Sequence, residues 1–200
     1  MTGLAQRLFI GGVLVFLAAP LVVLAGVSVN RPRRLLFPPD GFSLRWYGEL
    51  FAQPDWSGAL ANSLIIATLS AALAVSIALC LALYMWSRGG AFARTLFALG
   101  VAPFLLPPVI SALGFMVFWI SVGLYGQMLA TIVSHGVFLV ALPLVTIALG
   151  LESIDRQYIE AARTMGANRR AVFATIVLPL VRPYIISGYA FAFVLSLNEY

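Results

Sequence analysis

Charge is scarce in this sequence. Only 10% of its 200 residues are charged, whereas 62% are apolar. A soluble globular domain has about 25% charged and about 45–50% apolar residues, so this composition cannot cover a water-soluble surface. The composition therefore excludes a soluble enzyme and predicts a membrane protein.

Cysteine is almost missing and lysine is absent. Cys80, the one cysteine, lies in an apolar run, which excludes a disulfide framework and a thiolate metal cluster. All 12 basic residues are arginine, and with 7 acids they give a net charge of +5. This excess is typical of membrane-protein loops and requires no nucleic-acid partner. A GxxxxGK[ST] phosphate loop is also absent, so we expect no bound cofactor and no ATP hydrolysis by that route.

Long apolar stretches dominate what is present. A helix needs about 20 apolar residues to cross a hydrocarbon core of about 30 Å. Five stretches fit this requirement, namely residues 8–29, 60–86, 95–122, 127–149 and 180–197. The sequence thus predicts an all-α fold, a polytopic transmembrane helical bundle with five spans.

The two ends of the chain need separate interpretation. The first stretch is longer than the about 7–15 residues of a signal-peptide core, so we expect an uncleaved anchor. No polar tail follows the fifth stretch before Tyr200, and we expect a further outer loop and a sixth span beyond it. Residues 30–59, rich in proline, indicate an outer loop with a short surface helix over 44–51.

Arginines indicate the orientation. With the amino terminus in the cytoplasm, eight arginines lie on the inner side and four on the outer side. Arginine is enriched in cytoplasmic loops, so this orientation is favoured. Arg31, Arg33 and Arg34, directly behind the first span, argue in the other direction.

Several prolines fall inside the predicted spans: Pro103, Pro107, Pro108 and Pro143. Each removes a backbone donor, so we expect kinks where they occur. Kinks of this kind are found in gates and also in static bundles.

Residues 150–179 form the most informative segment, a cytoplasmic loop in this orientation. Apolar residues recur there at helical spacing and predict one apolar helix face, made of Ile154, Tyr158, Ala162 and Met165. Ser153 can cap the start of this helix, and Gly166 suits the left-handed turn that ends it. Asn168 can cap a second helix, which we expect Pro179 to end. The segment predicts two short helices joined at a tight corner.

Three interpretations of this shape remain open from the residues alone. The first is an amphipathic hairpin on the membrane surface. The second is a DNA-binding helix-turn-helix with Arg163, Arg169 and Arg170 at phosphates, which the flanking spans disfavour. The third is a docking element, in which the small pair Ala161-Ala162 lets a cytoplasmic partner approach closely.

The spacing of particular residues in this loop carries a resemblance. Glu160-Ala161-Ala162, then Gly166, then Ile176, then Leu178-Pro179 resembles the EAA loop of the membrane subunits of bacterial binding-protein-dependent ABC importers. Flanking features agree with the polyamine-type branch of that family: Asn62-Ser63-Leu64, Pro103 to Pro108, His135, Pro143, and Ser196-Leu197-Asn198-Glu199. The resemblance covers roughly residues 57–200.

The resemblance implies an architecture and a set of partners. Residues 1–56 would form an N-terminal span and outer loop, and residues 57–200 a permease domain with its coupling loop at 150–179. The partners would be a cytoplasmic ABC ATPase dimer, a second membrane subunit and an extracytoplasmic solute-binding protein, in the lipid bilayer of the bacterial inner membrane. Glu160, Ala161, Ala162 and Gly166 carry over to the docking of the ATPase.

A few polar residues lie inside the predicted spans. Such residues are often functional, and His135, Asn198 and Glu199 are candidates for the solute pathway. His135 could instead bond a neighbouring helix, and Glu199 could be the polar end of its helix. The resemblance favours a polyamine or another small cation.

Two other classes of membrane protein compete with the importer. A secondary transporter would use His135 and Glu199 as a proton relay, but the first four spans hold no other buried acid and no inverted repeat is visible. An intramembrane enzyme would need a Ser-His, HExxH or paired-acid set, which the spans lack.

The predicted orientation can be tested by labelling. Residues 31–56 and 123–126 are expected outside, and 87–94 and 150–179 in the cytoplasm. Single cysteines at Asp55 and Asn168, in a Cys80→Ser background, should differ in whole cells: an impermeant thiol reagent should label the first and spare the second. Labelling of position 168 from outside would overturn the orientation.

Overall fold

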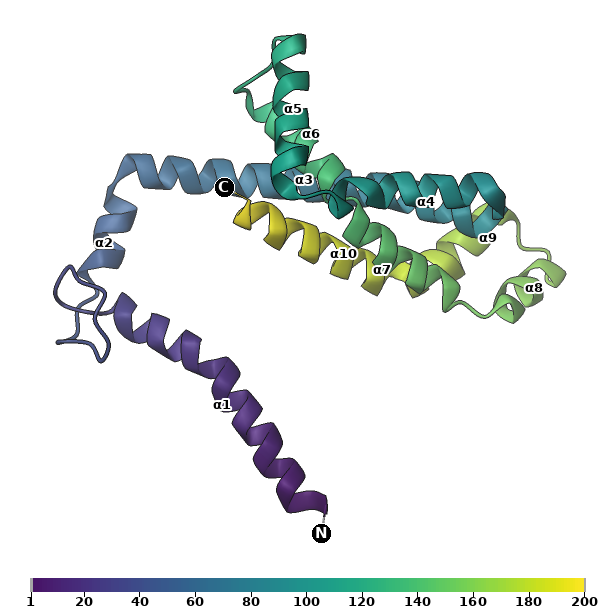
Figure 1. The fold of residues 1–200 in the computed structure, drawn as a ribbon. Helices are drawn as coiled ribbons and strands as arrows, with labels where there is room; N and C mark the ends of the chain where they lie inside the picture. The colour runs from purple at the N-terminus through teal and green to yellow at the C-terminus, as the bar shows by residue number, and fades with distance from the viewer. Residues whose placement is uncertain (1, 200) are drawn as a thin grey trace. The chain divides into compact units, whose positions relative to one another are not determined.

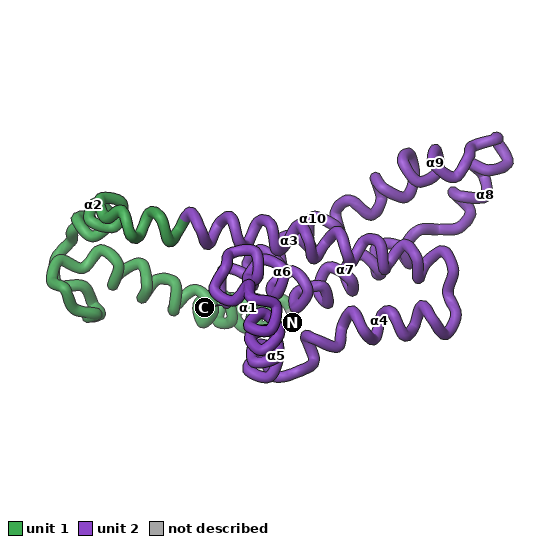
Figure 2. Tube along the Cα trace, turned by 90° about the horizontal axis from the view of Figure 1, so that it is seen from above, with its two compact units in different colours: residues 1–60 green, residues 61–200 purple. Residues whose placement is uncertain are grey.

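The computed structural model describes residues 2–199, which are almost wholly helical. The chain divides into two compact units, residues 1–60 and 61–200, and the boundary falls inside the long helix α3 (Pro54–Arg88). Figure 2 distinguishes the two units by colour. Each is described separately below.

The first unit holds α1 (Thr2–Ser28) and α2 (Arg45–Ala52). Helix α1 has a mean hydropathy of 2.7 over its most apolar window, and most of its side chains are exposed, so lipid or another subunit must cover it. Helix α2 confirms the short helix expected over 44–51, displaced by one residue.

The loop between α1 and α2 is folded around the side chain of Asn30, which is 1% exposed. Its amide nitrogen donates to the carbonyl of Arg34 at 3.1 Å, and its side-chain oxygen accepts the N–H of Asp40 at 2.9 Å. The indole N–H of Trp46, on α2, donates to the backbone carbonyl of Asn30 at 2.8 Å. One asparagine thus satisfies three loop segments and orders a stretch that its prolines keep non-helical.

The core of the second unit lies among α3, α4 (Gly90–Leu105), α7 (Ala141–Glu152) and α10 (Leu178–Asn198). Figure 1 shows these helices running beside one another. Small residues recur every three or four positions on the buried face of α3: Ala67, Ser70, Ala71, Ala74, Ala78 and Ala82. Larger buried side chains of α7 and α10 pack into this core, among them Leu144, Ile147 and Val181. Small-residue faces permit the close approach of helices that apolar surroundings alone would not drive together.

The span predicted over 95–122 contains the kink that its prolines predict, and this kink divides it into two helices. The chain bends by 101° between α4 and α5 (Pro108–Val122), at Leu106 and Pro107. Neither Pro107 nor Pro108 has a backbone N–H, and a residue before proline avoids the α region, so Leu106 is extended. The hydroxyl of Ser111 donates to the carbonyl of Pro103 at 3.4 Å and thereby satisfies one of the freed acceptors.

The span predicted over 127–149 corresponds to two helices that bend by 43°, α6 (Met128–Phe138) and α7. Helix α6 is tied to α3 by the hydroxyl of Ser70, which donates to the carbonyl of Ile132 at 3.1 Å. In the described part of the chain, three helices are long and apolar enough to cross a membrane, and five spans result when each bent pair is one span.

The prediction that Pro179 ends the second loop helix is wrong. After α9 (Arg169–Val172) the backbone forms a π-helical turn over Phe173–Val177 and continues directly into α10. The N–H of Leu178 donates to the carbonyl of Phe173, five residues back, and this wider turn lets proline follow without ending the helix. Residues 169–198 therefore form one helix, which includes the predicted span over 180–197.

The contact between α7 and α10 gives a test of the packing. A Cβ atom on Gly188 would lie 2.8 Å from the Cα atom of Pro143, a backbone atom that cannot turn aside. We expect Gly188→Ala to destabilise the purified protein by about 1–3 kcal/mol, the usual cost of overpacking, measured as a lower midpoint of thermal unfolding in detergent. Gly114→Ala is the matched control, since a Cβ atom there meets no described atom within 4 Å. Equal midpoints for the two variants would contradict this packing.

Candidate functional site

Helix α8 (Arg156–Thr164) begins in the loop predicted to couple, and Asp155 caps it. The Asp155 carboxylate accepts the N–H of Gln157 at 2.9 Å. Ser153, the predicted cap, instead donates its hydroxyl to the carbonyl of Gly150 at 2.8 Å, at the end of α7. The predicted cap is therefore wrong by two residues, because the chain needs an extended residue after α7 before a helix can restart.

The corner behind α8 is formed as the sequence predicts. Gly166 has φ = +87°, and the N–H of Ala167 donates to the carbonyl of Ala162 at 2.9 Å. This left-handed conformation suits glycine and is strained for other residues, above all β-branched ones. Asn168 then caps α9, its side-chain oxygen accepting the N–H of Ala171 at 2.9 Å.

The faces of α8 differ from the predicted ones. Ile159 and Ala162 are the buried residues of this helix, and Ile154 before it is buried as well. Tyr158 and Met165, expected on the same apolar face, are 61% and 81% exposed. Helical periodicity identified the apolar side chains of this segment but could not show which of them pack against the rest of the chain.

Two faces of α8 can therefore be assigned. The inward face holds the helix on the second unit through Ile159 and Ala162, so Ala162 is buried and not exposed to a partner as the docking prediction requires. The outward face presents Tyr158, Ala161 and Met165, all exposed, and Glu160 is exposed at the side of the helix. A small residue flanked by an aromatic, a thioether and a carboxylate makes a surface that a protein partner can approach closely.

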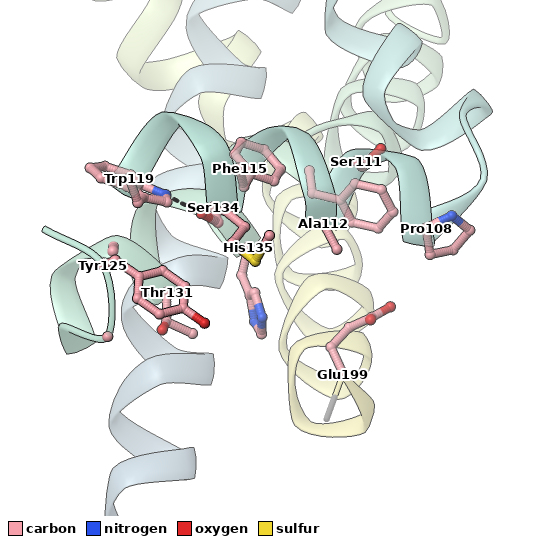
Figure 3. Close-up of a pocket in the computed structure, with 14 residues that line it drawn as sticks. Pro108, Ser111, Ala112, Phe115, Trp119, Tyr125, Thr131, Ser134, His135 and Glu199 are labelled. Carbon is pink, nitrogen blue, oxygen red and sulfur yellow. Dashed lines mark hydrogen bonds between the residues drawn. The ribbon is translucent and has the colours of Figure 1, made fainter. Parts of the chain in front are cut away.

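A second candidate site lies where α5, α6 and the end of α10 meet. It is a cavity of about 400 Å³, shown in Figure 3, with aromatic and hydroxyl side chains around one histidine and one carboxylate. The polar and aromatic side chains at its wall are Ser111, Phe115, Trp119, Tyr125, Thr131, Ser134, His135, Phe138 and Glu199. A mostly apolar cavity with a few convergent polar groups is the usual form of a small-molecule site.

Hydrogen bonds fix the wall of this cavity. The Nδ1 atom of His135 lies 2.9 Å from the hydroxyl of Ser196, which is buried on α10. The indole N–H of Trp119, on α5, donates to the hydroxyl of Ser134 at 2.7 Å. His135 therefore hydrogen-bonds a neighbouring helix, and its ring borders the cavity.

The other two residues predicted for the solute pathway, Asn198 and Glu199, differ in their position relative to the cavity. Glu199 lines the cavity with His135, so the structure brings these two together. Asn198 is exposed, does not line the cavity, and donates its side-chain amide to the carbonyl of Val194 at 3.1 Å. In the described part of the chain, no three His, Cys, Asp or Glu side chains are grouped closely enough to hold a metal ion.

The sequence did not identify Trp119 and Tyr125 as part of this site. Their position depends on the bend at Leu106 and Pro107, after which α5 lies alongside α6. The consecutive prolines signal a bend but not its direction. No spacing rule connects Trp119 to His135.

Comparisons with known proteins agree on one family. A family model described as "Binding-protein-dependent transport system inner membrane component" matches residues 74–200. The putrescine transport system permease protein PotI of Escherichia coli is 34% identical over 197 residues, which cover 92% of this chain and 68% of that protein.

Two further relatives are named for spermidine/putrescine and for molybdenum. The spermidine/putrescine transport system permease protein PotC of Haemophilus influenzae is 32% identical over 198 residues, covering 97% of this chain and 75% of that protein. The molybdenum transport system permease protein ModB of Mycobacterium bovis is 30% identical over 200 residues, covering 94% and 70%.

Proposed function

The chain belongs to the family of binding-protein-dependent transport system inner membrane components, and from that premise we propose that it docks a separate ATPase on α8 and lines the solute pathway with the His135 cavity. As a permease subunit of an ABC importer it is a multi-pass inner-membrane protein. This membership does not favour a secondary transporter.

The exposed face of α8 carries the docking proposal. Ile159 and Ala162 hold the helix on the bundle, while Ala161 is exposed on the other face and Glu160 is exposed beside Arg156 and Arg163. A helix that packs against the bundle on one face and is exposed on the other can be displaced by a partner, and this displacement can move the helices before and after it. The left-handed conformation of Gly166 sets the angle between α8 and the helix that follows it, α9 with α10.

The partners and the orientation follow from this docking. An ATPase lies in the cytoplasm, so α8 and the corner at Gly166 are cytoplasmic, and the amino terminus is cytoplasmic as well. A second membrane subunit would complete the pathway, and an extracytoplasmic binding protein would deliver the solute. The exposed apolar surfaces of α1 and α5 are available to lipid and to such a subunit.

Variants of Gly166 test the docking. Left-handed backbone costs a non-glycine residue about 1–2 kcal/mol, and Asn tolerates it better than Val. In the assembled transporter, Gly166→Val should reduce both ATPase co-purification and uptake about tenfold, the factor that such an energy corresponds to. Gly166→Asn is the matched control and should retain most of both. Normal ATPase recovery and uptake in Gly166→Val would show that α8 does not couple.

The solute is proposed from the chemistry of the cavity. The Glu199 carboxylate and the faces of Trp119 and Tyr125 line the same space, and carboxylates and aromatic faces both attract organic cations. Two of the relatives are named for putrescine or spermidine, which supports the same solute class. We therefore propose a polyamine or another small cation, whereas the relative named for molybdenum shows that the family extends to other solutes.

Replacement of Glu199 tests the solute class. Glu199→Gln keeps the shape of the side chain but removes its charge, and a charge-assisted contact contributes about 1.5–3 kcal/mol. Putrescine uptake should fall about tenfold or more, while ATPase co-purification stays unchanged. Glu49→Gln, on α2, is the control and should transport normally. Full putrescine uptake by Glu199→Gln, or an anionic native solute, would refute a cation pathway and leave the importer assignment intact.

A further inference from the structure

Two adjoining cavities open at the end of α3, apart from the His135 cavity. The basic cavity has a volume of about 720 Å³ and is lined by the end of α3, by α8 and by α9 with the π-helical turn. The apolar cavity has a volume of about 740 Å³ and lies among α3, α4 and α7. Trp86 and Arg156 line both cavities, so the two adjoin each other.

The basic cavity carries a strong excess of positive charge. Its lining includes Arg88, Arg156, Arg163 and Arg169 against a single acid, Glu160, which leaves an excess of three positive charges. Guanidinium groups present several donors in a planar fork that matches phosphate oxygens. The cavity is therefore suited to a phosphate-bearing ligand.

The apolar cavity continues from this charge into the helical bundle. Its lining is mostly apolar side chains from three helices, among them Ala82 and Met85, Ala93 and Phe97, and Val145 and Ala148, and its charged members are Arg94, Glu152 and Arg156. Val145 and Leu149, at its rim, are 39% and 56% exposed, so the cavity opens on a surface that must be covered by apolar material. A free phosphate ion would leave this half of the space empty.

We propose that the two cavities together bind one anionic phospholipid, with the headgroup phosphate at the four arginines and an acyl chain in the apolar cavity. Trp86 lies half-buried where the two cavities adjoin, and tryptophan favours the boundary between headgroup and hydrocarbon. Basic pockets between spans on the cytoplasmic side are a known physical form of headgroup recognition. The lipid would connect α8 to the ends of α3 and α4.

Lipid retention, measured without the ATPase reaction, tests this proposal independently of the docking function. The assembled transporter is placed in nanodiscs of phosphatidylcholine with a minor share of phosphatidylglycerol, transferred to detergent and analysed by native mass spectrometry. We expect one retained phosphatidylglycerol for each copy of this chain. The double variant Arg88→Gln/Arg163→Gln should retain about tenfold less, since two charge-assisted contacts are lost.

A matched arginine and a cavity-filling variant sharpen the test. Arg170 lies beside Arg169 in α9 but does not line the cavity, so Arg170→Gln should retain the lipid normally. Ala148→Phe should fill the apolar cavity and also reduce retention, and size-exclusion elution checks that each variant is folded. Normal retention in the double arginine variant, or an equal loss in Arg170→Gln, would overturn the site.

Inorganic phosphate separates a lipid from a free anion. Excess phosphate should leave the retained phosphatidylglycerol in place, because the acyl chain adds contacts that phosphate lacks. If phosphate displaces the lipid fully and Ala148→Phe has no effect, the cavity binds a free anion and the lipid proposal is wrong. If an acidic segment of the ATPase is cross-linked at Arg163 and no lipid is retained, the occupant is the ATPase and the proposal is equally wrong.

Discussion

The close packing of α7 against α10 is the contact on which the second unit depends. Gly188 allows the two backbones to meet at Pro143, and the buried side chains of both helices form one core with the alanine face of α3. Helix α7 enters the loop that carries α8, and α10 leaves it. The same helix pair therefore sets the position of α8 at one end, and it places Ser196 and Glu199 beside His135 at the other.

This arrangement gives the two candidate sites a common support. The helix from Arg169 to Asn198 runs without interruption from the corner behind α8 to the cavity, and its π-helical turn lies near the corner. A displacement of α8 by a partner would act on this helix directly. The first unit has its own organising residue, Asn30.

Much of the fold could be predicted from the sequence, because apolar length alone identifies helices that need a membrane. The cap at Asn168 and the corner at Gly166 were also predicted correctly, since each depends on local chemistry. The errors have different causes. The inward face of α8 depends on contacts with distant segments, and the continuation through Pro179 depends on a π-helical turn that no residue spacing signals. The prolines predict a kink but not the direction of the 101° bend, which brings Trp119 to the cavity.

The most direct test of the central claim, that α8 docks the ATPase, is cross-linking of α8 to the ATPase. A single cysteine at Ala161, in a Cys80→Ser background, is compared in the assembled transporter with one at Ala91, which is exposed at the start of α4. A short thiol cross-linker should join position 161 to the ATPase and leave position 91 unlinked. Cross-linking at 91 but not at 161, or none at either position in an active transporter, would contradict the account.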